Sequence, residues 1–182
     1  LAVALTRRTV PVLMCKGCSL IELDESGVRL NGTWASAFGE VAEGSAVLRR
    51  LRLSGCGLRG PLPDLRLPAL QTLDMSCNEL GNAFGTMFAS ILHQNATWTS
   101  VDMRCNGLRG DTCTEIAEAM CGNKSLTAMN LSDNAVEHEA AQHFAAMLES
   151  PLNTLTDLGG DRSPPHGGAS VSPRADGAPA LG

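Results

Sequence analysis

A ten-residue stretch recurs in this chain with its apolar positions kept. Residues 71–80 read QTLDMSCNEL, and residues 99–108 read TSVDMRCNGL, 28 residues later. The template L-x-x-L-x-L-x-x-N-x-L aligns both stretches, and it also aligns segments that start at Leu20, Leu48, Leu126 and Leu155. Neighbouring starts are 28 or 29 residues apart, except for the 22-residue step from Leu48 to residue 70. A fixed period of this length is typical of a solenoid made of stacked repeats.

Each long repeat predicts a short strand, a turn and a helix. Alternating apolar residues such as Leu73 and Met75 indicate a strand with one buried face. Apolar residues three and four apart in the second half of the repeat indicate a helix with one apolar stripe. These residues are Trp34, Phe38 and Val41; Phe84, Phe88 and Ile91; Ile116 and Met120; and Ala140, Phe144, Met147 and Leu148. The fold class predicted is an α/β solenoid with a right-handed coil, a curved parallel sheet inside and helices mostly outside.

The turn of the long repeats carries an asparagine, at positions 78, 106 and 134. An amide side chain has both donors and acceptors, so we expect it to satisfy backbone groups that leave the strand ladder. Two repeats depart from the template. The repeat from Leu48 has Pro61, Pro63 and Pro68 where a helix is expected, and proline interrupts helices. The repeat from Leu20 has Glu25 and Val28 where the template has leucine and asparagine.

The alignment predicts the organisation of the whole chain. Residues 1–19 form the back half of a preceding repeat whose strand is missing, as in an excerpt from a longer array. The array of about five units covers residues 20–158, with units at 20–47, 48–69, 70–97, 98–125 and 126–154 and a partial unit from 155. Residues 159–182 are rich in glycine, proline, serine and alanine, a composition typical of a disordered tail.

These motifs resemble the leucine-rich repeat family over roughly residues 20–158. The 28-residue unit is similar to the ribonuclease-inhibitor-like subclass, and the 22-residue unit is similar to the shorter plant-type repeat. The resemblance implies protein ligands bound on a concave sheet face. We therefore expect a non-enzymatic interaction module or scaffold, with no cofactor, no metal and no catalytic residues.

The outward positions of the strands are the candidate site. The fifteen positions are Glu22, Asp24, Ser26, Arg50, Arg52, Ser54, Thr72, Asp74, Ser76, Ser100, Asp102, Arg104, Ala128, Asn130 and Ser132. The acidic pair at 22 and 24 lies beside the basic pair at 50 and 52, so cross-strand ion pairs are expected. No aromatic anchor is among them, which predicts a polar interface. The residues predicted to bind a protein partner are Arg50, Arg52, Asp74, Asp102, Arg104 and Asn130.

Charge and hydropathy exclude other partners. The net charge is −5 with only two lysines, whereas binding to a phosphate backbone needs clustered basic residues. The apolar stretches are far shorter than the roughly 20 residues that span a bilayer, so no membrane insertion is expected.

The seven cysteines are an odd number, and most stand at repeat positions, which favours reduced thiols and a cytoplasmic protein. The C-x-x-C of Cys15 and Cys18 is a repeat junction, or else half a zinc site or a redox pair. Cys77 and Cys105 lie in register on adjacent coils. Their side chains point the same way, which makes a disulfide difficult, so we expect two free thiols.

Two alternative functions remain open. The subclass includes the GTPase-activating protein of the nuclear transport GTPase, so a regulator of a small GTPase is possible. A secreted or cell-surface recognition protein is the other alternative, because four glycosylation sequons begin at Asn31, Asn95, Asn123 and Asn130. Two of these sequons fall at the same repeat position, so the repeat itself generates them.

Overall fold

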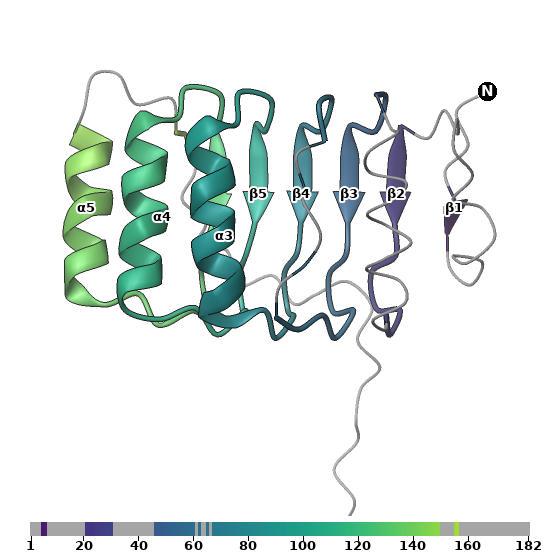
Figure 1. The fold of residues 1–182 in the computed structure, drawn as a ribbon, viewed down its shortest axis with the longest axis horizontal. Helices are drawn as coiled ribbons and strands as arrows, with labels where there is room; N and C mark the ends of the chain where they lie inside the picture. The colour runs from purple at the N-terminus through teal and green to yellow at the C-terminus, as the bar shows by residue number, and fades with distance from the viewer. Residues whose placement is uncertain are drawn as a thin grey trace, which may run out of the picture.

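The computed structural model describes residues 5–6, 21–30, 46–60, 62, 65, 67–149 and 155–156. Within these ranges, six parallel strands form one sheet in chain order (Figure 1). The strands are β1 Leu5–Thr6, β2 Glu22–Asp24, β3 Arg50–Arg52, β4 Thr72–Asp74, β5 Ser100–Asp102 and β6 Ala128–Asn130. The helices are α3 Gly81–Gln94, α4 Asp111–Gly122 and α5 His138–Glu149. None of these helices is long and apolar enough to cross a bilayer.

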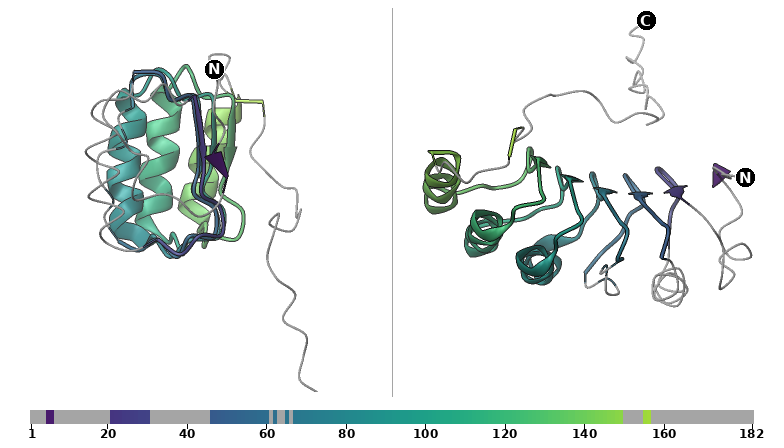
Figure 2. Two further views of the ribbon diagram at one scale, coloured as in Figure 1. Left: turned by 90° about the vertical axis from the view of Figure 1, so that its right-hand side faces the viewer. Right: turned by 90° about the horizontal axis from the view of Figure 1, so that it is seen from above.

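The sheet and the helices form two layers. Seen from above, the strands stand in a row, and α3, α4 and α5 fan out along its outer side (Figure 2). The pairing register joins Leu23, Leu51, Leu73, Val101 and Met129 across β2 to β6. These are the residues that the template aligns, so the predicted alignment of the strands and the α/β solenoid fold are confirmed. The outer limits of each repeat remain predictions.

The segment before the first full repeat departs from the expectation. The strand predicted to be missing is present, because β1 pairs in parallel with β2, with Leu5 opposite Leu23. The edge of β2 would otherwise present unpaired backbone groups, and two residues of β1 cover part of it. The rest of residues 1–19 and the predicted tail at 159–182 lie outside the described residues.

The core lies between the sheet and the helices, and its centre is aromatic. The rings of Phe84 and Phe88 stack at 6.1 Å between centroids, and those of Phe88 and Trp98 stack at 5.5 Å. All three side chains are fully buried. The predicted stripes of α4 and α5 are buried as well, except that Leu148 is 48% exposed. Leu148 follows Met147, so it lies about 100° further round the helix and faces solvent. Trp34, Phe38 and Val41 lie outside the described residues.

The 22-residue repeat fills its share of the core without a helix. No helix occurs among the described residues between β3 and β4, as its prolines predict. Instead Leu62, Leu65 and Leu67 are buried from an irregular backbone. The core therefore continues from the helical repeats into this shorter one.

The turn asparagines, Asn78, Asn106 and Asn134, bond to backbone groups that leave the strand ladder, as predicted, and they also link neighbouring coils. The Nδ2 of Asn106 donates to the carbonyl of Met103 in its own coil and to that of Met75 in the coil before, both at 3.0 Å. The Oδ1 of Asn134 accepts from the backbone N–H groups of Asn106 and Leu108. In the 22-residue repeat Cys56 stands in place of the asparagine, and its thiol donates to the carbonyl of Glu25 at 3.0 Å. A thiol therefore supplies one of the bonds that an amide makes elsewhere.

Glu25 is a carboxyl group in a core position. It occupies the leucine slot of its repeat and is only 4% exposed, and its Oε2 has no hydrogen-bond partner in the described part of the chain. Burial raises the pKa of Glu25 above its ordinary value of 4.5, and the charge of Asp24 adds to the effect. The folded state therefore holds the proton more tightly than the unfolded state, and stability falls as the pH rises above 4.5.

Replacing Asn106 with alanine tests the linkage between coils. We expect Asn106→Ala to lower the free energy of unfolding by about 1–3 kcal/mol, because buried carbonyls lose a donor. Urea denaturation followed by circular dichroism measures the change. Asn82→Ala is the control, since this exposed side chain accepts a single bond from the Arg109 N–H. An equal loss in both variants would contradict a special role for the turn asparagines.

Glu25→Gln tests the cost of the buried charge. At neutral pH the variant is expected to be more stable than the parent, because an amide of the same shape avoids burying a charge. The difference should shrink as the pH falls toward 4.5, because below 4.5 the parent carboxyl is protonated in both states. Thermal or urea unfolding at several pH values measures it. A difference independent of pH would show that charge is not the cause.

Candidate functional site on the strand face

The strands expose a polar surface on the side away from the helices. The middle residue of each strand from β2 to β6 is buried, so the first and third residues point outward. We call these ten residues the strand face: Glu22, Asp24, Arg50, Arg52, Thr72, Asp74, Ser100, Asp102, Ala128 and Asn130.

The structure brings the six predicted site residues together on this side. Four of them, Arg52, Asp74, Asp102 and Asn130, form one row across β3 to β6 in the pairing register. Arg50 lies on the same strand as Arg52, and Arg104 follows Asp102 by two residues. Their role in binding stays a prediction.

Ion pairs neutralise the part of the strand face on β2 and β3. The Nη1 of Arg52 lies 2.6 Å from Glu22 Oε1 and 3.7 Å from Asp24 Oδ2. The Nη1 of Arg50 lies 3.7 Å from Glu22 Oε2, but the Arg50 side chain is 57% exposed. The cross-strand pairs expected from the sequence are confirmed. Arg50 keeps most of its surface available for a partner.

Three predicted site residues also hold the backbone. The Oδ1 atoms of Asp74, Asp102 and Asn130 each accept a hydrogen bond of 3.0 Å from the backbone N–H two residues further on. This arrangement is an Asx turn, which bends the chain at the end of the strand. Sequence reasoning missed this role. The signal was present, because aspartate or asparagine recurs at the third strand position in four of the five strands from β2 to β6.

Ser76 is not part of the exposed surface, although it was predicted to be. It is fully buried, because its hydroxyl donates to Asp74 Oδ1 at 2.7 Å and lies 2.8 Å from the hydroxyl of Ser54. The contacts of the Ser76 hydroxyl set it apart, because Ser26, Arg104 and Ser132 follow the same kind of Asx turn and are only half-buried.

Asp102 has an unusual environment for a surface carboxyl. Burial raises its pKa above the ordinary value of 3.8, and the neighbouring Asp74 carboxylate raises it further. The Arg104 backbone N–H and the Arg104 side chain oppose the shift, with Arg104 Nε 3.4 Å from Asp102 Oδ2. Two acidic side chains therefore lie side by side on β4 and β5. The Arg104 side chain offsets part of the negative charge that these two carboxylates bring to this part of the strand face.

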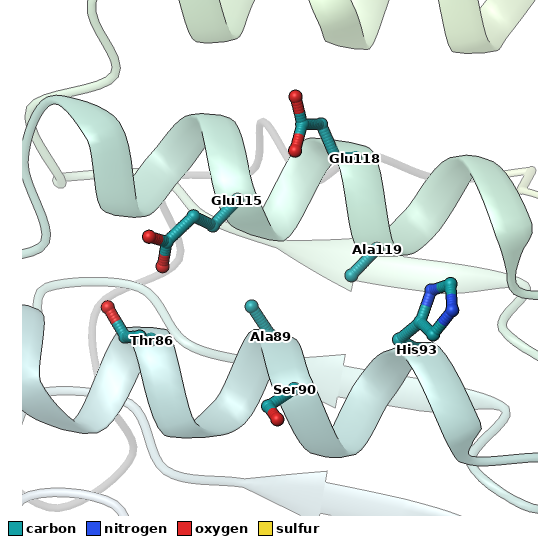
Figure 3. Close-up of a pocket in the computed structure, with 7 residues that line it drawn as sticks. All are labelled: Thr86, Ala89, Ser90, His93, Glu115, Glu118 and Ala119. Carbon is teal, nitrogen blue, oxygen red and sulfur yellow. The ribbon is translucent and has the colours of Figure 1, made fainter.

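A groove on the helix side offers no matching chemistry. It lies between α3 and α4 and has a volume of about 380 Å³. Glu115 points toward α3, Glu118 points away from it, and His93 lies at the far end (Figure 3). The titratable groups of this groove do not converge on one point. Within the described ranges, no three histidine, cysteine or acidic residues are placed to hold a metal ion.

The cysteines in the described ranges are free thiols: Cys56, Cys77, Cys105, Cys113 and Cys121. The expectation of two free thiols at Cys77 and Cys105 is therefore confirmed. Burial raises the pKa of Cys56 to about 11, so this thiol stays protonated and acts as a donor. Cys15 and Cys18 lie outside the described residues.

One predicted glycosylation site is part of the interior. Asn123 is 7% exposed, and its Nδ2 donates to the carbonyls of Leu92 and Asn95. Its Oδ1 accepts from the N–H groups of Ser125 and Leu126. The same nitrogen would have to carry a glycan, so the folded chain does not offer it. Asn31 lies outside the described residues.

Comparison with known proteins agrees with the repeat pattern. Residues 47–65 match a family model described as Leucine Rich Repeat, and residues 67–83 match a second described as Leucine Rich repeat. The chain therefore contains leucine-rich repeats. The matched residues lie on both sides of the join between the 22-residue repeat and the first described helical repeat. Assignment to the ribonuclease-inhibitor-like subclass remains a prediction.

Two known proteins are similar to this chain, one in sequence and one in fold. It is 28% identical over 145 residues to "NACHT, LRR and PYD domains-containing protein 14" of Mus musculus. The alignment covers 76% of this chain and 14% of that protein. The chain thus spans about a seventh of the length of this curated relative. A solved structure of "Leiomodin-1 Actin-Binding Site 2 (ABS2)" shares 18% identity at a TM-score of 0.51, covering 77% of this chain and 69% of that one. This second likeness concerns the fold alone.

Asp74→Asn tests the coupling between the two carboxylates. Asparagine keeps the acceptor of the Asx turn, as Asn130 shows, but removes the charge beside Asp102. We expect the pKa of Asp102 to fall, and the loss of stability between pH 3.8 and neutrality to shrink by about 0.2–1 kcal/mol. Carbon-detected NMR titration and urea unfolding measure the two effects.

Glu22→Gln is the control for this titration, because Glu22 lies three strands away from Asp102. An unchanged pKa of Asp102 in Asp74→Asn would exclude the coupling.

Proposed function

We propose that this leucine-rich repeat chain is a non-enzymatic interaction module in the cytoplasm, which binds a protein partner through the strand face. The observation that carries this proposal is the continuous row of polar side chains across β3 to β6, of which Asp74, Asp102 and Asn130 are held in place by hydrogen bonds from the backbone. A preorganised surface loses little conformational freedom on binding. The exposed Arg50 and the acidic pair at 74 and 102 would give the partner a charge pattern to recognise.

The geometry also favours binding over catalysis. A catalytic site needs a nucleophile, base or acid that converges with others in a cavity. The groove between α3 and α4 keeps its acidic and histidine groups apart (Figure 3). The two described cavities, one between α3 and α4 and one beside Leu67 and Ile91, are not lined by strand-face residues. One oxygen of each carboxylate at 74 and 102 already accepts the hydrogen bond of an Asx turn.

The proposed cytoplasmic location draws support from the thiols and the sequons. All five described cysteines are free. The amide of Asn123 is consumed by the carbonyls of the preceding coil. A reducing compartment would keep such thiols as they are.

A pair of surface variants tests the proposal without disturbing the Asx turns. On the strand face, Arg50→Glu reverses a charge and Ser100→Arg adds a positive one in the same protein. Glu118→Arg reverses an exposed charge on the helix side. Each protein is used in affinity capture with quantitative mass spectrometry, after circular dichroism has shown that it folds. We expect the strand-face variant to lose about tenfold or more of a captured protein, because juxtaposed like charges cost several kcal/mol. Glu118→Arg should retain it.

Three outcomes would count against the proposal. A partner lost only by Glu118→Arg would place the binding surface on the helices. Capture of equal amounts by all three proteins would exclude the strand face. If the chain stimulated GTP hydrolysis by a captured GTPase, it would be a regulator of that GTPase and not a passive interaction module.

A further inference from the structure

One residue with a positive φ angle ends each strand turn, and it recurs at the same repeat position. The five residues are Gly27, Gly55, Cys77, Cys105 and Asp133. Glycine adopts this left-handed backbone freely, whereas a residue with a Cβ atom is strained there. Two neighbouring coils nevertheless carry cysteine, with φ angles of 54° and 53°. The demands of the turn do not explain this residue choice.

The two cysteines are direct neighbours across the coils. Strands β4 and β5 pair in register, with Asp74 opposite Asp102. The register continues past the strands, because the Cys77 N–H donates to the Arg104 carbonyl at 2.9 Å. The Cα atoms of Cys77 and Cys105 are therefore about one strand spacing apart, about 4.8 Å. This separation falls within the range of about 4.4–6.8 Å found for disulfides.

The two thiols differ in their access to solvent. Cys105 is exposed and Cys77 is half-buried. Burial raises the pKa of the Cys77 thiol, the adjacent Cys105 raises it further, and the Arg104 charge opposes them. Cys105 is therefore the thiol that a dissolved reagent reaches first, and Cys77 lies beside it as a protonated thiol. An exposed cysteine next to a second, resolving cysteine is typical of redox-sensitive sites.

We propose that Cys77 and Cys105 form a reversible redox site that reacts with low-molecular-weight disulfides and closes into a disulfide between adjacent coils. The Cys105 thiolate attacks one sulfur of the small disulfide, forms a mixed disulfide and releases one thiolate. Cys77 then gives up its proton and attacks the Cys105 sulfur, which releases the second thiolate. The two protein thiols are oxidised to one disulfide, and the small disulfide is reduced to two thiols that take up the two protons.

The closed form is expected to be easily reduced. In-register parallel strands hold the Cβ atoms about 4.8 Å apart, whereas disulfides have a mean separation of about 3.8 Å. Closing the bond must draw the two coils together, and a strained disulfide is more readily reduced. The site therefore suits a reversible modification rather than a permanent cross-link. It does not depend on the proposed function, because only the two thiols and their register define it.

Peptide mapping after exposure to oxidised glutathione tests the site directly. Trypsin cleavage after Arg66, Arg104 and Arg109 places Cys77 in residues 67–104 and Cys105 in residues 105–109. In the parent protein we expect these two peptides to be joined, and to separate again after mild treatment with reduced glutathione. In Cys105→Gly or Cys77→Gly the linked pair should be lost, at least tenfold below the parent. The cysteine that remains should instead carry glutathione.

Glycine is chosen for these variants because it stands at this turn position in two other coils, so the fold should tolerate it. The control is Cys121→Ser, because Cys121 lies in the last turn of helix α4, where a glycine is unsuitable. Cys121 is exposed on α4, and the positions 28 residues before and after it are His93 and Glu149, which carry no thiol. The linked pair should form in this control as in the parent.

Other products would overturn the proposal. Glutathione on both Cys77 and Cys105 of the parent, with no linked peptides, would show that the two sulfurs cannot meet. A linkage of Cys105 to a different cysteine would show that the proposed Cys77–Cys105 pairing is wrong. A Cys77–Cys105 bond that resists reduced glutathione would make the bond structural and exclude a reversible site.

Discussion

The hydrogen bonds of the turn asparagines hold the coils in register at the point where the strands end. Strands β2 to β6 are only three residues long, so their ladders alone supply few bonds between neighbours. Asn78 adds donors to the carbonyls of Leu53 and Met75 at 2.8 Å, one in each of two adjacent coils. A buried amide with all its partners satisfied tolerates no slip, because a displaced coil would leave carbonyls unpaired in the core. The helices, the core and the strand face all inherit this register.

Some polar side chains of the strand face are likewise already bonded to the backbone. Asp74, Asp102 and Asn130 belong to the row predicted to bind a partner, yet each side chain already caps the backbone after its strand. Their second oxygen or nitrogen atoms are what a partner could contact. The first-position residues of the same strands, such as Thr72 and Ser100, make no such bond to the backbone after the strand. The two rows therefore differ, because only the third-position row is tied to the backbone after the strand.

The sequence could predict those parts of the structure that repeat. The template aligns the buried residues of five strands, and the helical periodicity identifies the faces of α3, α4 and α5, because burial alternates with a regular period in each. It could not predict β1, since a strand of two residues is too short to show a periodicity. Ser76 and Leu148 were misplaced for different reasons. Ser76 lies beyond the end of β4, where its hydroxyl contacts the side chains of Asp74 and Ser54, whereas Leu148 lies within α5 but one residue past the buried stripe.

The candidate site was predictable in position but less so in chemistry. The pairing of Glu22 with Arg50 and Arg52 follows from residues of opposite charge on neighbouring strands, and the structure confirms it. The dual role of Asp102 does not follow from its charge. It depends on a local backbone turn and on partial burial, and both arise only when residues 100–104 are folded against their neighbours.

Stacking turns the property of one residue into a property of a pair. At about one strand spacing, any side chain type that recurs at one position meets its own copy in the next coil. Where the type can both donate and accept, or can bond to the backbone, repetition stabilises. The hydroxyls of Thr99 and Thr127, for example, donate to the carbonyls of Gln71 and Thr99. Where the type carries charge, as at Asp74 and Asp102, repetition raises a pKa. Where the type is a thiol, repetition creates two sulfurs that can react with each other, and this chemistry exists only because the coils are in register.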